Sequence, residues 1–321
     1  MESSLDLSVI IPHFDCPDLL YRLLSTIPPH PGVEVIVVDD NSEKKPDPSS
    51  LSRFPHVVYY ENTSGKKGAG TCRNIGLEHA KGRWVIFADA DDIFLPGFYS
   101  IVAKYFTAEE EVIFFVPTSR YSDSGELGFR HEADAGILLR YLKERDHKSE
   151  LLVRYYIAAP WSKLIRRDFI EMHGLRFDEV LASNDVMFAT KLGYHMKRFQ
   201  VSPETIYCVM LRHGSLVMRK SREVIEARID THIRYVQFLK SYLPGKDARY
   251  VFLSRAFKRS LGLLNAARRI GVTYFLSTWF RFIRSGVPIV SWRLITPSFV
   301  WEKITKTLPN MKRESRFYTG R

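Results

Sequence analysis

Acidic side chains follow two apolar runs of the sequence, at the point where each run ends. Asp39 and Asp40 come directly after one run, and Asp89, Asp91 and Asp92 follow another within four residues. Hard divalent ions prefer carboxylate oxygens as ligands, and a diphosphate that leaves in a reaction needs such an ion to offset its charge. The pair Asp89 and Asp91 therefore predicts a Mn²⁺ or Mg²⁺ site. The alternative is a solvated acidic turn with no ligand.

The elements that must position these carboxylates alternate along the chain. Strands are expected at 7–11, 33–38, 57–60, 84–88 and 112–116, with helices at 19–24, at 71–80 and from 96. Strands that alternate with helices form a mostly parallel, Rossmann-like sheet flanked by helices, and ligands bind beyond the carboxyl ends of such strands. We therefore expect an α/β fold in which both acidic groups share one site. Residues 129–167 are expected to be mixed and mostly helical, and residues from 223 onward helical.

Two further segments could bind a nucleotide. Pro12 ends the first expected strand, and Phe14 could offer an aromatic face to a uracil ring whose imide N–H donates to Asp40. The alternatives are a core position for Phe14 and an Asx turn for Asp40. The glycine-rich segment 65–74 carries Lys66 and Arg73 just before a helix, which suits an anion. It lacks the spacing of a Walker loop, and its alternative is an exposed basic loop.

Taken together, these segments resemble glycosyltransferase family 2. The family patterns S-V-I-I-P, V-V-D-D-x-S, A-R-N-x-G and D-x-D-D match, in this order, residues 8–12, 37–42, 72–76 and 89–92, with Cys72 in place of the usual Ala. Phe14 and Asp15 replace a common Tyr and Asn. The resemblance implies a GT-A fold, a nucleoside diphosphate sugar donor, expected to be UDP-linked, and inversion at the anomeric carbon. It also implies that Asp91 holds the Mn²⁺ or Mg²⁺ ion, aided by Asp89.

The resemblance continues to about residue 215. Residues 161–164 resemble W-x-K-L, residues 174–179 G-x-x-F-D-E, and residues 212–215 R-x-G-S. Asn184-Asp185 stands where the family has E-D, which implies that Asp185 is the catalytic base. Asp185 also lies in the first turn of a helix expected at 183–192 with Ser183 as its cap, where a negative charge is favoured. A helix-terminal carboxylate without a catalytic role is the alternative.

The expected reaction is a single in-line displacement, in which Asp185 takes the proton of an acceptor hydroxyl and the nucleoside diphosphate leaves. Lys66, Arg73 and His213 could add positive charge near the phosphates, although Arg73 could instead pair with the acidic cluster. Trp161 and Asn184 are the candidate acceptor contacts. For Trp161, core packing is an equally good interpretation.

The formal net charge of +11 is unevenly distributed. From Lys240 to the end there are 17 Lys or Arg against 3 Asp or Glu, whereas the rest holds 30 against 33. A basic tail predicts an anionic partner, and its interleaved aromatic residues suit an anionic membrane surface. The alternative is a set of helices that pack on the catalytic part. The expected division is a catalytic domain at 1–220, with a nucleotide-binding half at 1–100 and an acceptor half at 101–220, and a basic helical region at 221–321.

Other features bear on location and on rival functions. The three cysteines, Cys16, Cys72 and Cys208, suggest neither a disulfide framework nor a zinc site, which fits a reducing cytoplasm. We expect no secretory signal and no run of the roughly 18 apolar residues that span a bilayer. The expected location is cytoplasmic or on the inner face of the plasma membrane, with a glycan or lipid-linked glycan of surface polysaccharide as acceptor.

Two rival functions are considered from the sequence: a sugar nucleotidyltransferase and a non-enzymatic binding protein. A sugar nucleotidyltransferase usually has an early glycine-rich loop, and residues 12–18 offer none. A non-enzymatic protein that binds nucleic acid or membrane could use the basic tail. No nucleic-acid-binding signature is present, so nucleic acid is not an expected partner.

Overall fold

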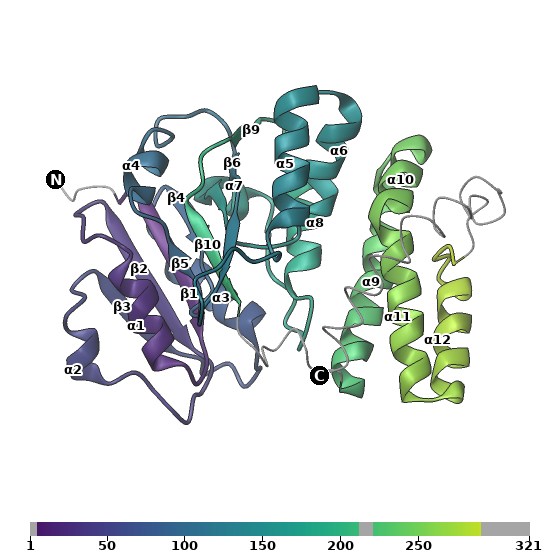
Figure 1. Cartoon of the computed structure of the whole chain (residues 1–321), viewed down its shortest axis with the longest axis horizontal. Coiled ribbons are helices and arrows are strands. Elements are labelled where there is room, and N and C mark those ends of the chain that lie inside the picture. Colours follow the sequence, from purple (N-terminus) through teal and green to yellow (C-terminus); the bar gives the residue numbers. More distant parts are fainter. Residues whose placement is uncertain (1–4, 212–220, 290–321) are drawn as a thin grey trace.

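The computed structural model describes residues 5–211 and 221–289 (Figure 1). Its centre is a seven-stranded sheet in the order β3-β2-β1-β4-β8-β6-β9. All neighbours pair in parallel except β8, which is antiparallel to both β4 and β6. The expected α/β class with a mostly parallel sheet is therefore confirmed. The strands are β1 (Leu7–His13), β2 (Val33–Asp39), β3 (Val57–Glu61), β4 (Trp84–Phe87), β6 (Val112–Phe115), β8 (Lys163–Arg166) and β9 (Phe199–Ser202).

The central strands are apolar on both faces because helices cover both sides of the sheet. Successive side chains of β1 enter different clusters: Val9 and Ile11 pack on one face, and Ile10 on the other. The helices of this part are α1 (Pro17–Ser25), α2 (Pro48–Leu51), α3 (Ala69–His79), α4 (Phe98–Ala103), α5 (Glu132–Glu144), α6 (His147–Tyr156), α7 (Arg167–Met172) and α8 (Asp185–His195).

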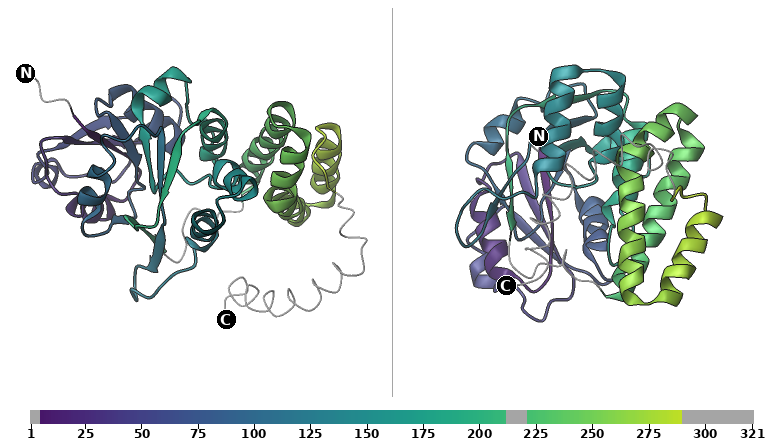
Figure 2. Two further views of the ribbon diagram at one scale, coloured as in Figure 1. Left: turned by 90° about the horizontal axis from the view of Figure 1, so that it is seen from above. Right: turned by 45° about the vertical axis from the view of Figure 1, so that its right-hand side comes forward.

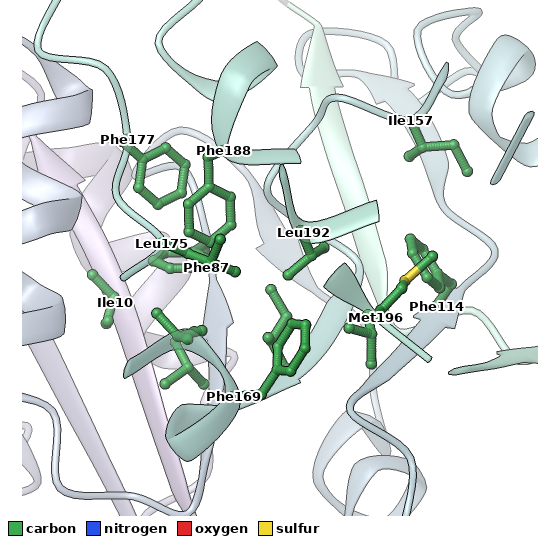
Figure 3. Packing of buried hydrophobic residues seen from close by; sticks show 14 of the residues in the cluster. Ile10, Phe87, Phe114, Ile157, Phe169, Leu175, Phe177, Phe188, Leu192 and Met196 are labelled. Carbon is green, nitrogen blue, oxygen red and sulfur yellow. The ribbon is translucent and has the colours of Figure 1, made fainter. Parts of the chain in front are cut away.

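An aromatic cluster fixes α8 and the loop before it over β4 (Figure 3). The rings of Phe177 and Phe188 stack with centroids 4.0 Å apart, and Phe87 of β4 meets Phe177 edge-on at 5.0 Å. Such pairs add about 0.5–1.5 kcal/mol each beyond the burial of their area. The start of α8 is thereby held at the end of β4.

The segment 129–167 is mixed and mostly helical, as expected, and it also contains strand β8 at residues 163–166. One sequence expectation about this region is wrong. Ser183 does not cap α8, which begins at Asp185 with Asn184 as its N-cap and without a side-chain cap. Ser183 instead has φ of +61°, a left-handed conformation that residues other than glycine adopt infrequently.

A smaller sheet lies beside the first, in the order β5-β10-β7. Its strands are β5 (Ile93–Phe94), β7 (Thr118–Tyr121) and β10 (Tyr207–Leu211). The segment 212–215, with the predicted phosphate ligand His213, lies outside the described residues.

Helices predominate in the described residues 221–289, as expected. They are α9 (Arg222–Tyr242), α10 (Gly245–Val251), the π-helical turn η2 (Phe252–Ala256), α11 (Phe257–Ile270) and α12 (Val272–Arg284). They lie together at one end of the molecule, against α6 and α8 (Figures 1 and 2). None of the helices in the described ranges has the length and apolar character needed to cross a membrane. The division at residues 220 and 221 stays a prediction.

Candidate active site

The carboxyl ends of β1, β2 and β4 meet at one edge of the sheet because these three parallel strands are neighbours. At this edge Asp39 is fully buried and binds two side chains. His13 Nδ1 lies 2.7 Å from its Oδ1, and the Ser42 hydroxyl donates to the same oxygen at 2.6 Å. Burial by itself raises the pKa of Asp39, but the hydrogen bonds from Ser42 and His13 outweigh it, so the pKa lies below its ordinary value. Asp39 therefore holds the strand-end loops together.

The neighbouring Asp40 connects these loops to the glycine-rich segment. Its Oδ1 accepts from the Asn62 amide at 2.8 Å, and its Oδ2 from the Gly68 N–H at 2.7 Å. Phe14 is 48% exposed, which excludes the core position considered for it. An exposed aromatic ring such as that of Phe14 is compatible with stacking on a nucleobase. The roles of Pro12, Phe14 and Asp40 toward a nucleoside stay predictions.

The glycine-rich segment leads directly into α3. Gly65 and Gly68 have φ of +76° and +118°, which only glycine adopts without strain. Lys66 is exposed, and its Nζ lies 2.6 Å from Glu179. A β-carbon on Gly70 would lie 2.2 Å from the carbonyl oxygen of Asp178. The absence of a side chain at Gly70 therefore lets α3 touch the loop that precedes α8.

Arg73 of α3 joins two of the three predicted carboxylate segments. Its Nη2 lies 2.5 Å from Asp89 Oδ1, and its Nη1 donates to Asn184 Oδ1 at 2.9 Å. Arg73 is 4% exposed, and its guanidinium lies over the Phe177 ring, 5.2 Å from the centroid. Of the two roles considered for Arg73, pairing with the acidic cluster is the one seen here. The Asn184 oxygen is turned toward Arg73, whereas a contact between Asn184 and an acceptor stays a prediction.

Buried hydrogen bonds of Asp92 and Tyr207 connect the acidic loop to β10. Tyr207 donates its hydroxyl hydrogen to Asp92 Oδ2 at 2.8 Å and accepts from the Asp89 N–H at 2.9 Å. The Met210 N–H donates to the other oxygen of Asp92 at 2.8 Å. Burial, together with the charges of Asp89 and Asp91, raises the pKa of Asp92. Tyr207 was not predicted as a site residue, because a tyrosine in an apolar strand has the appearance of a core residue.

The acidic loop fits a divalent ion that arrives with a diphosphate. No group of three or more His, Cys, Asp or Glu in residues 5–211 and 221–289 could hold a metal without other ligands. Mg²⁺ is commonly bound through one or two carboxylates plus substrate phosphates. Asp89 and Asp91 supply oxygen ligands of this kind, and the side chain of Asp89 is 34% exposed. Which of them binds an ion stays a prediction.

Asp185 begins α8, next to the residue that Arg73 contacts. Its side chain is half-buried and stands at the N-terminus of the helix. The bridge from Asp89 through Arg73 to Asn184 therefore brings the start of α8 to the end of β4. Trp161, by contrast, is 6% exposed and stacks on Tyr207 with centroids 5.8 Å apart. This burial favours core packing for Trp161, whereas a contact between Trp161 and an acceptor stays a prediction.

Comparisons with known proteins identify relatives of the chain. The Bacillus subtilis protein EpsH, whose name classes it with glycosyltransferases, is 24% identical over 220 residues, covering 65% of this chain and 61% of EpsH. The Escherichia coli enzyme WfaP, named UDP-Glc:alpha-D-GlcNAc-diphosphoundecaprenol beta-1,3-glucosyltransferase, is 27% identical over 142 residues, or 42% of this chain and 55% of WfaP. This chain thus covers less than two thirds of the length of these relatives.

The fold has a counterpart in a solved structure. S. aureus TarS 1-349, in complex with UDP-GlcNAc, superimposes with a TM-score of 0.70 at 18% identity, covering 90% of this chain and 85% of the 1-349 chain. At this identity the likeness supports the fold alone, and it confirms the expected GT-A architecture. The family model described as Glycosyl transferase family 2 matches residues 8–174, just over half of the chain. The chain therefore belongs to glycosyl transferase family 2.

Proposed function

We propose that this glycosyltransferase transfers a sugar from a nucleoside diphosphate sugar, with UDP as the expected nucleotide, to a hydroxyl of a glycan or lipid-linked glycan, with inversion. One observation carries the proposal. Arg73 contacts both Asp89 and Asn184, so the strand end with the acidic loop and the helix that begins with Asp185 share one site. The names of WfaP and TarS in its UDP-GlcNAc complex are in keeping with this donor class.

The chain's residues divide the work of an in-line displacement. Asp185, held at the N-terminus of α8, accepts the proton of the acceptor hydroxyl as that oxygen attacks the anomeric carbon. Asp89 and Asp91 would hold a Mn²⁺ or Mg²⁺ ion, which when bound offsets the charge of the leaving diphosphate. Arg73 keeps Asp89 in place from a buried position. Lys66 and His213 are proposed to add positive charge near the phosphates. Phe14 and Asp40 are proposed to contact the nucleobase, Phe14 by stacking and Asp40 by accepting its imide N–H.

The test of the reaction separates binding from chemistry. Asp185→Asn should fold and bind donor like the wild type but turn over roughly 10²- to 10⁴-fold more slowly, the range for loss of a general base. Asp91→Ala should weaken Mn²⁺-dependent donor binding in a thermal-shift titration. The product should be a nucleoside diphosphate, because pyrophosphate would indicate a nucleotidyltransferase. Near-normal turnover by Asp185→Asn would remove Asp185 from the mechanism.

We further propose that α12 attaches the enzyme to an anionic membrane surface. Val272, Leu276, Phe280 and Ile283 are between 44% and 70% exposed and fall on one side of α12. The opposite side packs on the protein through the buried Phe282. Exposed arginines lie near this stripe, at 268, 269 and 284. An apolar stripe flanked by cations is the pattern of a helix that lies in an anionic interface.

Sedimentation with vesicles tests the attachment. Phe280→Ser should reduce binding to vesicles that contain phosphatidylglycerol, whereas Met172→Ser, which changes a 77% exposed side chain on α7, should not. Wild-type binding should weaken as salt rises. Equal sedimentation of both variants and the wild type would argue against the assigned stripe.

A further inference from the structure

The loop 177–184, which delivers Asp185 to the site, is held by α3 on one side. Asn74 forms two hydrogen bonds with the backbone of Phe177, at 3.0 and 2.8 Å. The Asp178 N–H donates to the carbonyl of Asn184 at 3.0 Å, which closes the loop on itself. The position of Asp185 therefore depends on where this loop rests.

The other side of the loop is held by helices from the C-terminal region. The guanidinium of Arg234 on α9 makes two hydrogen bonds to the carboxylate of Asp178, at 3.1 and 2.8 Å. Arg259 on α11 donates to the hydroxyl of Ser183 at 2.9 Å. Two separate helices thus reach the two ends of one short loop. The contact between Arg234 and Asp178 fixes the direction of the Asp178 carboxylate as well as its distance, because both Nη atoms of the planar guanidinium are engaged.

The contact from Arg259 falls on the strained residue of the loop. Ser183 has φ of +61°, a conformation that is unfavourable for a residue with a side chain and persists only where its surroundings impose it. The next two residues are Asn184, which contacts Arg73, and Asp185. The strained position and its outside contact therefore stand directly before the candidate base.

Stability alone does not account for the contact that Arg234 makes. The side chain of Arg234 is 44% exposed, and ion pairs at exposed sites contribute little to folding. The helices α9 and α8 already pack against each other through buried apolar residues such as Val186 and Ile229. Because packing holds the helices together, the polar contacts are free to set the local geometry of the loop.

We propose that Arg234 and Arg259 are positioning residues for the transfer reaction, and that the C-terminal helices are a structural part of the active site through them. The proposal rests on the proposed function of Asp185. The arginines touch neither donor nor acceptor in this scheme. They act through the loop 177–184, which presents Asp185 to the acceptor hydroxyl.

The test uses the full-length chain and compares turnover with donor binding. Arg234→Met and Arg259→Met should each lower kcat roughly 10- to 100-fold, the effect of displacing a reacting group by up to 1 Å. The donor KM should stay within about twofold of the wild-type value, because the nucleotide half is untouched. The exposed Arg249→Met on α10 is the matched control and should leave both constants unchanged. Thermal melting and donor binding verify that each variant is folded.

A double-mutant cycle supplies the second measurement. If Arg234 acts through Asp178, then Arg234→Met combined with Asp178→Asn should lower kcat no further than the more harmful single change. Additive losses, or a kcat for both arginine variants equal to that of Arg249→Met, would overturn the proposal. A failure of the proposed function is distinguishable, because then Asp185→Asn would itself turn over at the wild-type rate.

Discussion

Replacing Gly70 with alanine should push helix α3 away from the loop 177–184, by a distance that follows from the structure. The added β-carbon would lie 2.2 Å from the carbonyl oxygen of Asp178 and 2.9 Å from Cβ of Asn184. An ordinary contact between carbon and oxygen is about 3.3 Å or longer, so α3 and the loop 177–184 must move apart by about 1 Å. The obstacle is backbone, which cannot rotate away as the end of a side chain can.

Two measured quantities should respond in Gly70→Ala. Overpacking of this kind costs about 1–3 kcal/mol of unfolding free energy, and the better helix propensity of alanine returns at most about 1 kcal/mol. Turnover should fall roughly 100-fold, because a displacement of about 1 Å at a reacting group has that effect. Donor binding should change less, since the loop carries the candidate base.

Gly136 in α5 is the matched control. It is exposed, and a β-carbon there would meet no heavy atom within 4 Å. Gly136→Ala should therefore raise the unfolding free energy by about 0.5–1 kcal/mol without changing turnover. Denaturant unfolding and a sugar-transfer assay on both variants complete the comparison. If Gly70→Ala matched Gly136→Ala in both measurements, the loop 177–184 would not rest on α3 as described.

Three further changes test other parts of the site. Tyr207→Phe removes the hydroxyl that donates to the buried Asp92. It should lower the unfolding free energy by about 1–3 kcal/mol in urea denaturation and weaken Mn²⁺ binding. A variant as stable as the wild type would contradict the hydrogen bonds that join Tyr207 to Asp92 and Asp89. Asp39 has a lowered pKa in the folded state, so its ionised form stabilises the fold above the ordinary value of 3.8 and this contribution is lost as pH falls through the lower, folded pKa. Asp39→Asn should accordingly be less stable at pH 6 and lose less stability between about pH 6 and 3 than the wild type, and parallel pH profiles would refute the assignment. Arg73→Met should reduce kcat more than it weakens donor binding, and steady-state kinetics would show the opposite if Arg73 bound the phosphates instead.

The sequence predicted β1, β2, β3, β4 and β6 but not the other five described strands, of which β8 shows one reason. The runs that became β1, β2, β4 and β6 are continuous and apolar, and helices on both sides leave no other place for them. Strand β8, by contrast, begins with Lys163 and ends with Arg166. Lys163 is buried, and its Nζ donates to the carbonyl of Ile157 at 2.8 Å. Tertiary structure brings Lys163 to the carbonyl of Ile157, so the local sequence pattern could not predict this strand.

The same limit applies to the site. Residue types at strand ends predicted which segments would meet, because parallel strands bring their carboxyl ends to one edge. They did not predict which side chains would pair. Arg73 could have faced a phosphate or a carboxylate, and only the packing of α3 against the loop decides for Asp89 and Asn184. Ser183 was expected to cap α8. Its hydroxyl instead accepts a hydrogen bond from Arg259, 76 residues later in the chain.

The basic C-terminal region shows why a count of charges misleads about partners. From Lys240 to the end, 17 Lys or Arg against 3 Asp or Glu predict a strongly cationic surface, yet some of these cations have partners inside the protein. Arg281 contacts both Glu226 and Asp230 on α9, and Arg259 contacts the loop that precedes the candidate base. Because cations in ion pairs are neutralised where they lie, the proposed attraction to an anionic surface depends on exposed groups such as Arg284 at the end of α12. Under the two proposals the same helical region would have two separable roles, one set by the contacts of Arg234 and Arg259 with the loop 177–184 and one by its outer face.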